Sequence, residues 1–169
     1  MASKYKTMEA RTARNSFITM NELVLPNDTN TFGDLMGGKL MYWMDIAAYL
    51  AAAKHCNSAC MTASVDNLSF KSPIRLGNVI CIEAIVTRSF NTSMEVHLKV
   101  WNQNMITQSR ELSNEAFFTF VALDENKQPK KVPELIPESE EEKKYFAGAL
   151  RRRQLRLILA GKMLPDDAT

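Results

Sequence analysis

The chain has 169 residues, 46% hydrophobic and 24% charged, which is typical of one globular domain. Lysine and arginine total 21 against 19 acidic residues, a formal charge of +2, so the dense positive surface of a nucleic-acid-binding protein is excluded. The longest strongly apolar run, residues 40–53, is interrupted by Asp45 and is shorter than the roughly 20 residues of a spanning helix. We therefore expect neither a nucleic-acid nor a membrane partner.

The first 15 residues contain no apolar segment of the length that a secretory signal needs. Cys56, Cys60 and Cys81 are an odd number of cysteines, which argues against a disulfide framework and for reduced thiols. His55 lies beside Cys56, but these loosely spaced groups lack a fourth partner and do not make a zinc signature. The sequence thus predicts a cytoplasmic protein without a metal site.

A strand is predicted first, over residues 15–25, because hydrophobic residues dominate there before Pro26. Residues 26–38 carry three glycines with Asn and Asp, the residue types of a shaped loop. Residues 38–55 are rich in Leu, Met and Ala, which predicts one long helix. This helix is apolar on nearly every side, so we expect other parts of the fold to enclose it.

Four strand-like runs follow, at 61–70, 79–88, 93–101 and 115–123. The first changes the phase of its apolar positions at Asp66 and Asn67, which predicts a β-bulge. The third alternates hydrophobic and polar residues, so one face should be buried and the other mixed. The last is almost entirely apolar, as expected of a central strand covered on both faces.

Beyond Lys127 the chain is polar and punctuated by prolines, and a charged helix is predicted from about Ser139. We therefore expect an N-terminal tail (1–14), one folded domain (15–133) and a C-terminal helical extension (134–169). A strand, a buried helix and four antiparallel strands in that order predict an α+β fold, in which a curled antiparallel sheet wraps around one long central helix.

Two features of the helical segment suggest chemistry. Asp45 is a carboxylate in an apolar helix without adjacent Lys or Arg, so it should be partly desolvated and suited to act as a general base. Its alternative role is a cap or an ion pair inside an oligomer interface. Gly37 and Gly38 lie where unpaired helix N–H groups can hold a developing oxyanion. These glycines could equally serve the close packing of the loop.

Four segments, taken together, resemble the acyl-CoA thioesterases of the hotdog fold: PNDTNTFGDLMGGKLMYWMD (26–45), TASVDNLSFKSPIRLG (62–77), TSM (92–94) and FFTFVALD (117–124). Their common order within residues 15–133 makes the resemblance specific. It implies a long helix inside a curled sheet, and hydrolysis of fatty acyl-CoA to fatty acid and CoA. No metal or cofactor is implied, because coenzyme A is part of the substrate and product.

By position, Asn30 and Asp45 match the family's functional Asn and Asp, and the expected role of Asp45 is to activate the attacking water. Gly38 is a catalytic candidate through its N–H at the helix start. Without the resemblance, Asn30 would be interpreted as a turn residue. Arg75 is a further candidate for phosphate contact. The residues implied to hold the substrate or its CoA moiety are Gly37, Thr62, Phe70, Lys71, Pro73, Arg88, Thr92 and Ser93.

Asp45 lies seven residues beyond Gly38, which is about 10 Å along a helix axis. One thioester carbonyl cannot readily contact both, so we expect Gly38 of one subunit and Asp45 of its neighbour to complete one site. The resemblance implies the same homo-oligomer, with a dimer as the catalytic unit and three such pairs in a hexamer.

Two other functions stay open at this point. A non-catalytic acyl-CoA-binding or sensor oligomer would keep the pocket without turnover, although the presence of both Asn30 and Asp45 favours the enzyme. A hotdog hydratase is less favoured, because neither His55 nor His97 lies in the motif. Four arginines of the C-terminal segment are interpreted as a solvated helix face, rather than a contact to the CoA 3′-phosphate or a partner: Arg151, Arg152, Arg153 and Arg156.

Overall fold

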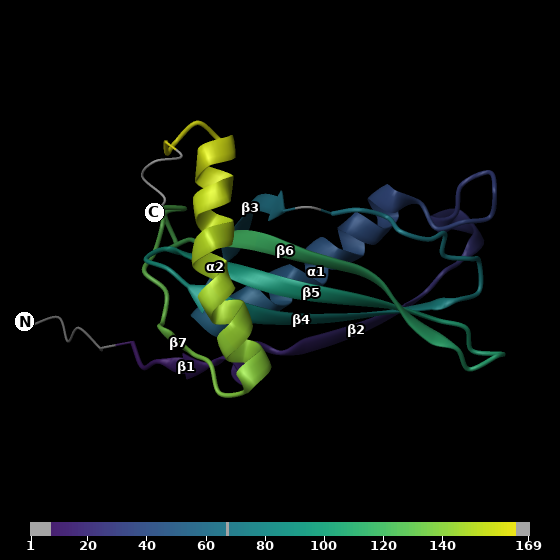
Figure 1. Ribbon diagram of the computed structural model, residues 1–169, viewed down its shortest axis with the longest axis horizontal. Coiled ribbons are helices and arrows are strands. Elements are labelled where there is room, and N and C mark those ends of the chain that lie inside the picture. Colours follow the sequence, from purple (N-terminus) through teal and green to yellow (C-terminus); the bar gives the residue numbers. More distant parts are fainter. Residues whose placement is uncertain (1–7, 67, 165–169) are drawn as a thin grey trace, which may run out of the picture.

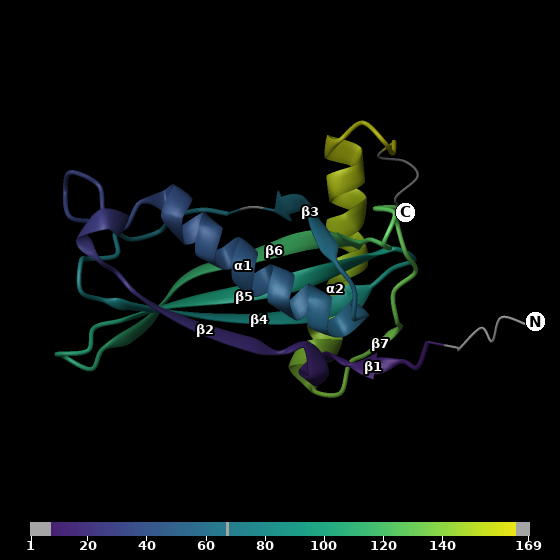
Figure 2. The same cartoon turned by 180° about the vertical axis from the view of Figure 1, so that it is seen from behind.

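The computed structural model describes residues 8–66 and 68–164. An antiparallel sheet with the strand order β2-β4-β5-β6-β3 forms its centre, and the long helix α1 (Gly37–Cys56) lies along one face of it (Figure 1). Figure 2 shows the same helix from the face that it covers. The predicted α+β fold, a curled antiparallel sheet around one long helix, is confirmed. The strands are β2 (Ile18–Leu23), β3 (Cys60–Asp66), β4 (Val79–Ser89), β5 (Ser93–Gln103) and β6 (Arg110–Ala122).

Helix α1 agrees with the predicted segment to within one residue at each end. It ends where Asn57 adopts the left-handed conformation (φ 51°, ψ 43°) and donates its N–H to the carbonyl of Ala53, a common way to close a helix. Its buried side packs on the inner face of the sheet as part of the main core. That side comprises Leu40, Trp43, Met44, Ala47, Ala48, Ala51 and Ala52.

The prediction that α1 is enclosed on all sides is wrong for the single chain. Met41, Tyr42, Tyr49 and Leu50 are between 38% and 58% exposed along the side that faces away from the sheet. The sheet covers one side of the helix, and an apolar side remains open. Exposed apolar surfaces of this kind mark interaction sites, so α1 is available for contact with another molecule.

The edge strands are shorter than the hydrophobic runs suggested. A 3₁₀ turn, η1 (Ala13–Ser16), occupies the start of the predicted first strand, and the Ser16 hydroxyl within it accepts the N–H of Val86. A second 3₁₀ turn, η2 (Pro26–Asp28), follows β2. In β3 the register shifts between Thr62 and Ser64, whereas Asn67, part of the predicted bulge, lies outside the described residues.

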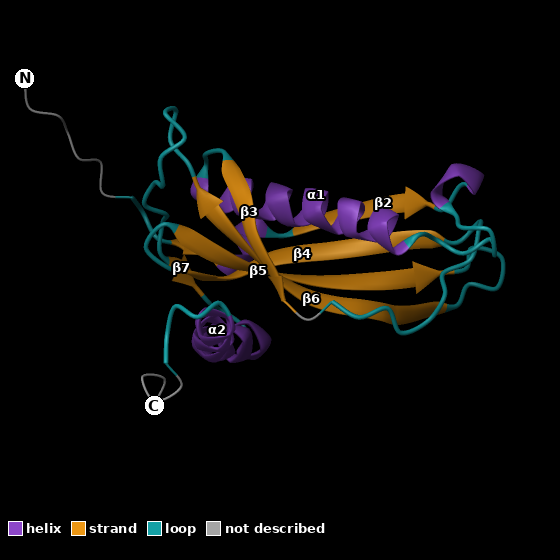
Figure 3. Cartoon of the chain, turned by 90° about the horizontal axis from the view of Figure 1, so that it is seen from above, coloured by secondary structure: helices purple, strands orange, loops and turns teal. Residues whose placement is uncertain are grey.

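Helix α2 (Glu140–Leu159) covers the outer face of the sheet, opposite α1 (Figure 3). It starts where predicted, at Ser139, whose hydroxyl accepts the N–H of Glu142 in a capping box. Strand β5 is therefore not half-exposed as its alternation suggested, because Glu95 and His97 on its mixed face are buried. Strand β6 is an interior strand between β5 and β3, as predicted.

A short parallel pair joins the N-terminal segment to the segment that precedes α2, because β1 (Arg11–Thr12) pairs with β7 (Leu135–Ile136). The predicted divisions at residues 14/15 and 133/134 stay predictions. In the described part of the chain, no helix has the length and apolar character to span a bilayer.

Candidate active site

The first turn of α1 presents free backbone N–H groups. Met36 precedes the helix in an extended conformation and supplies no side-chain cap. Among the described residues, neither the Gly37 N–H nor the Gly38 N–H has a hydrogen-bond acceptor. Two donors at the positive end of a helix are an anion-binding arrangement.

A cavity of about 360 Å³ opens beside this helix end. Five of the predicted site residues line it together: Asn30, Gly37, Phe70, Lys71 and Pro73. The remaining wall was not predicted from the sequence and consists of Asp34, Leu35, Leu40, Ser72 and Ile74. Its apolar members, Leu35, Leu40 and Ile74, could equally have been interpreted as core residues from the sequence. The structure thus brings the loop 26–38 and the segment 70–74 together around one opening.

Asn30 has a structural task within the loop. Its side-chain Oδ1 accepts the N–H groups of Phe32 (2.9 Å) and Asp34 (3.2 Å), so Asn30 holds the turn that shapes the cavity wall. These bonds occupy the carbonyl side of the amide. The Nδ2 donors of the same side chain remain for a ligand in the cavity that Asn30 lines.

The two glycines at the start of α1 differ in their surroundings. A Cβ atom at Gly37 would lie 3.1 Å from the Phe70 ring, whereas a Cβ atom at Gly38 would meet nothing within 4 Å. Close packing within the chain therefore explains why residue 37 is a glycine, but it does not explain the glycine at position 38. The space over Gly38 is open to a molecule from outside the chain.

Asp45 lies farther along α1, on the same side as the exposed apolar residues. It is partly buried, and its Oδ1 accepts a 2.7 Å hydrogen bond from the Thr62 hydroxyl on β3. Thr62 was expected to contact the substrate, and its bond to Asp45 was not foreseen. The bond joins residues that are 17 positions apart, so no local sequence pattern could have revealed it.

Asp45 does not line the cavity at the helix start. The seven residues between Gly38 and Asp45 correspond to about 10 Å along the axis. Within one chain, the free amides and the carboxylate are therefore separate, as the sequence geometry predicted.

Arg88, Thr92 and Ser93 lie elsewhere. Arg88 is near the end of β4, Thr92 is in the β4–β5 turn and Ser93 begins β5. This turn is at the end of the sheet that α2 covers, away from the loop that precedes α1 (Figure 1). The Arg88 guanidinium is occupied within the chain, because it donates to the Phe146 carbonyl (2.9 Å) and lies 4.1 Å from the Phe146 ring centre. Arg75 pairs with Asp34 at 2.9 Å, which leaves Lys71 as the cation of the cavity wall.

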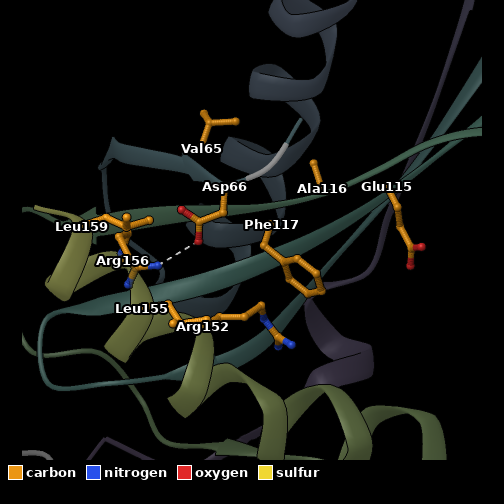
Figure 4. Close-up of a pocket in the computed structure, with 9 residues that line it drawn as sticks. All are labelled: Val65, Asp66, Glu115, Ala116, Phe117, Arg152, Leu155, Arg156 and Leu159. Atoms are coloured by element: carbon orange, nitrogen blue, oxygen red, sulfur yellow. Dashed lines mark hydrogen bonds and ion pairs between the residues drawn. The ribbon is translucent and has the colours of Figure 1, made fainter. Parts of the chain in front are cut away.

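The interpretation of the arginine run as a solvated face is wrong for two of its members. Arg152 makes a bidentate bond to the buried carboxylate of Glu95 (2.8 and 2.9 Å). Arg156 pairs with Asp66 of β3 at 3.1 Å. Both line a second cavity of about 300 Å³ between α2 and the sheet edge, shown in Figure 4. These arginines attach α2 to the sheet, and their charges are matched inside the chain.

Both histidines are buried parts of the scaffold. Burial lowers the pKa of His97, although its 2.7 Å bond to Glu115 acts in the opposite direction. Burial likewise lowers the pKa of His55, whose Nε2 lies 3.0 Å from the Pro133 carbonyl. Within residues 8–66 and 68–164, no group of three or more His, Cys, Asp or Glu side chains could hold a metal ion.

The chain is similar in sequence and in structure to known proteins. The family model described as the thioesterase superfamily matches residues 32–108. YkhA of Bacillus subtilis (strain 168), an uncharacterized acyl-CoA thioester hydrolase, is 41% identical over 147 residues, which are 87% of this chain and 86% of that protein.

Solved structures agree over nearly the whole chain. An apo-hexameric acyl-CoA thioesterase is 41% identical with a TM-score of 0.87, and the match covers 90% of this chain and 97% of that one. An acyl-CoA hydrolase from Staphylococcus aureus, in complex with butyryl-CoA, CoA and CoA disulfide, is 31% identical with a TM-score of 0.83, covering 95% and 99%. Structures of that hydrolase also exist with alanine in place of one aspartate, one asparagine or one threonine.

Proposed function

We propose a mechanism for this chain, which belongs to the thioesterase superfamily and is an acyl-CoA thioesterase. The open start of α1 and Asp45 together hydrolyse fatty acyl-CoA to fatty acid and CoA. The observation that supports these roles most directly is the cavity at the helix start, which Gly37 and Asn30 line. The N–H of Gly38, next along the helix and not part of the cavity wall, is unpaired like that of Gly37 among the described residues. Asp45, held by Thr62, supplies the base, because the carboxylate in the cavity wall, Asp34, is paired with Arg75.

The thioester carbonyl oxygen docks at the N–H groups of Gly37 and Gly38. Both donate to that oxygen, and their attraction grows as negative charge develops during attack. The open space over Gly38 lets the acyl group approach the backbone closely. Asn30 Nδ2 donates to the carbonyl oxygen or to the attacking water, while its Oδ1 keeps the loop in shape.

Asp45 takes a proton from the attacking water, and the hydroxyl oxygen forms a bond to the carbonyl carbon. The resulting tetrahedral intermediate breaks its carbon–sulfur bond, and CoA leaves as a thiolate that is then protonated. The Thr62 hydroxyl donates to Asp45 Oδ1, so the carboxylate is oriented with its other oxygen free for the water.

The catalytic unit in this proposal is a dimer. Edge strand β3 is joined to α1 by the Thr62–Asp45 bond, and the exposed residues of α1 are apolar. A two-fold contact through this strand and helix sets two α1 helices side by side in opposite directions. Asp45 of the partner subunit then lies near the cavity of the first. The hexameric relative supports three such pairs as the full assembly.

The CoA moiety contacts more than one subunit in this proposal. Lys71 lies at the mouth of the cavity and suits a phosphate oxygen. Arg88 has further N–H donors beside the one that binds the Phe146 carbonyl, and in this proposal it reaches, with Thr92 and Ser93, a CoA bound at a neighbouring subunit's cavity. The three free cysteines are consistent with a cytoplasmic location, which we include in the proposal.

A thioester-hydrolysis panel across acyl lengths, followed by thiol release, tests the proposal when it includes Asp45→Asn. We expect this variant to bind CoA and to lose about 10²- to 10⁴-fold in turnover, the usual effect of losing a general base. Glu125→Gln, an exposed acidic residue outside the site, is the matched control and should keep full activity. Near-normal turnover in folded Asp45→Asn would exclude Asp45 as the base.

A further inference from the structure

Two cysteines face each other across the turn between α1 and β3. Cys56 is the last residue of α1 and Cys60 is the first residue of β3, and their Sγ atoms are 3.2 Å apart. The short turn 57–59 connects them. Neither thiol takes part in the proposed hydrolysis. The third cysteine, Cys81 on β4, is as buried as Cys56 (7% and 5% exposed), and burial raises the pKa of its thiol.

The two thiols have opposite chemical characters. Hydrogen bonds from Cys60 and Ser58 stabilise the Cys56 thiolate and lower its pKa to about 6, against the opposing effect of burial. The same bond holds the proton on Cys60, whose pKa is raised. The negative end of a helix would ordinarily disfavour a thiolate. Here Arg11 donates to the carbonyls of Lys54 (3.1 Å) and His55 (2.7 Å) and neutralises that end.

A route from solvent to Cys56 exists. Cys56 lines a cavity of about 470 Å³ at this end of the molecule, together with Arg11 and Lys130. Glu9 also lines this cavity, so the two cations leave a net charge of +1 around the opening, which favours a small anionic reactant over a neutral one. Attack by a thiolate requires such access, and Cys81 is not among the residues that line this cavity.

We propose that Cys56 and Cys60 form a thiol–disulfide exchange site for small anionic disulfides, with Cys56 as the attacking thiol and Cys60 as the resolving thiol. The Cys56 thiolate attacks one sulfur of the disulfide, forms a mixed disulfide and releases one thiolate. Cys60 then gives up its proton and attacks the Cys56 sulfur, which releases the second thiol and leaves a Cys56–Cys60 disulfide. The two cysteines lose two electrons and two protons, and the small disulfide gains them as two thiols.

The site adjoins the catalytic machinery without depending on it. Cys60 lies two residues before Thr62 on β3, and Cys56 ends the helix that carries Asp45. The bridge would therefore link covalently the two elements that the Asp45–Thr62 bond already joins. Because the thiol chemistry needs none of the roles assigned to Asn30, Asp45 or Gly38, its test is separate from that of the proposed hydrolysis.

The test is incubation of the whole protein with glutathione disulfide at neutral pH, followed by thiol titration and peptide mass mapping. We expect two of the three thiols to be lost, a mass lower by two hydrogen atoms, and full reversal by a dithiol reductant. Cys81 serves as the internal control within the same molecule and should stay reduced. Retention of both Cys56 and Cys60 thiols, or equally fast loss of Cys81, would overturn the proposal.

Variants separate the two steps. Cys60→Ser should stop at a glutathione mixed disulfide on Cys56, whereas Cys56→Ser should leave Cys60 unmodified. Lys130→Gln should slow the reaction with glutathione disulfide but not with neutral 2-hydroxyethyl disulfide. A mixed disulfide on Cys60 in Cys56→Ser, formed as fast as the wild-type reaction, would contradict the assignment of Cys56 as the attacking thiol. If a serine variant fails to fold, the peptide map of the wild-type protein still decides the proposal.

Discussion

The Thr62 hydroxyl lies 2.7 Å from Asp45 Oδ1 and joins edge strand β3 to the exposed side of helix α1. A carboxylate on a helix surface would otherwise have several rotamers available. The bond restricts Asp45 to one orientation, turned toward edge strand β3. In our account, this orientation is what makes Asp45 a base for a site on the partner subunit.

Replacing Thr62 tests that orientation. Thr62→Val removes the donor with little change in shape, and we expect kcat to fall about 10- to 100-fold, because a misplaced catalytic group is costly. KM should change little. Thr62→Ser restores the hydroxyl and should recover most of the turnover. A Thr62→Val enzyme with wild-type kcat would show that Asp45 does not need this bond.

The two glycines at the start of α1 give a matched pair of variants. Gly38→Ala adds a methyl group where nothing lies within 4 Å, so we expect no loss of thermal stability. Turnover should nevertheless fall more than about tenfold, because the methyl group blocks the approach to the amides. Gly37→Ala must instead displace the Phe70 ring, and its effect should appear in KM. Full activity of Gly38→Ala would contradict the docking of the carbonyl at this position.

Asn30 performs two separable tasks. Asn30→Ala removes the acceptor of two backbone N–H groups, and we expect the free energy of unfolding to fall by about 1 kcal/mol. Asn30→Asp keeps an acceptor oxygen but loses the Nδ2 donors, so stability should be nearly retained while turnover falls. Denaturant unfolding and kinetics on both variants provide the comparison. If Asn30→Asp is fully active, Asn30 is a turn residue alone.

The stability of the protein should fall on mild acidification. Burial, assisted by the charges of Lys99 and Arg152, keeps the pKa of His97 below its ordinary 6.5, despite the opposing Glu115. Below about pH 6.5 the unfolded chain therefore binds a proton that the folded chain excludes, so stability decreases as the pH falls. His97→Gln should flatten this decline in thermal melts between roughly pH 7.5 and 5.5. An unchanged slope of stability against pH would show that His97 does not contribute to the decline. Because His55 is present in both proteins, its own titration does not affect this comparison.

The local composition of the sequence was sufficient for the helix and most strands. The Leu, Met and Ala content of residues 38–55 predicted α1, and the almost entirely apolar run 115–123 predicted that β6 lies inside the sheet. These local patterns did not predict contacts between residues that are distant in sequence. Glu95 and His97 indicated a mixed, half-exposed face, but α2 returns to cover it and Arg152 neutralises Glu95.

The sequence likewise predicted part of the candidate site. The residue spacing predicted the separation of Gly38 from Asp45, because a helix has a fixed rise. Asn30, Phe70 and Lys71, which line one cavity, could be selected as site residues only through the resemblance, because the path of a loop does not follow from hydrophobic periodicity. The Asp45–Thr62 bond needed the structure itself.

Subunit complementation tests the shared site most directly. Asn30→Asp and Asp45→Asn chains are each expected to form nearly inactive homodimers. After exchange of subunits, random pairing makes about half of the dimers mixed, and each mixed dimer holds one site with both groups intact. We predict recovery of roughly a quarter of the wild-type activity. If mass analysis confirms mixed dimers and no activity returns, both groups act within one chain and the shared-site account is wrong.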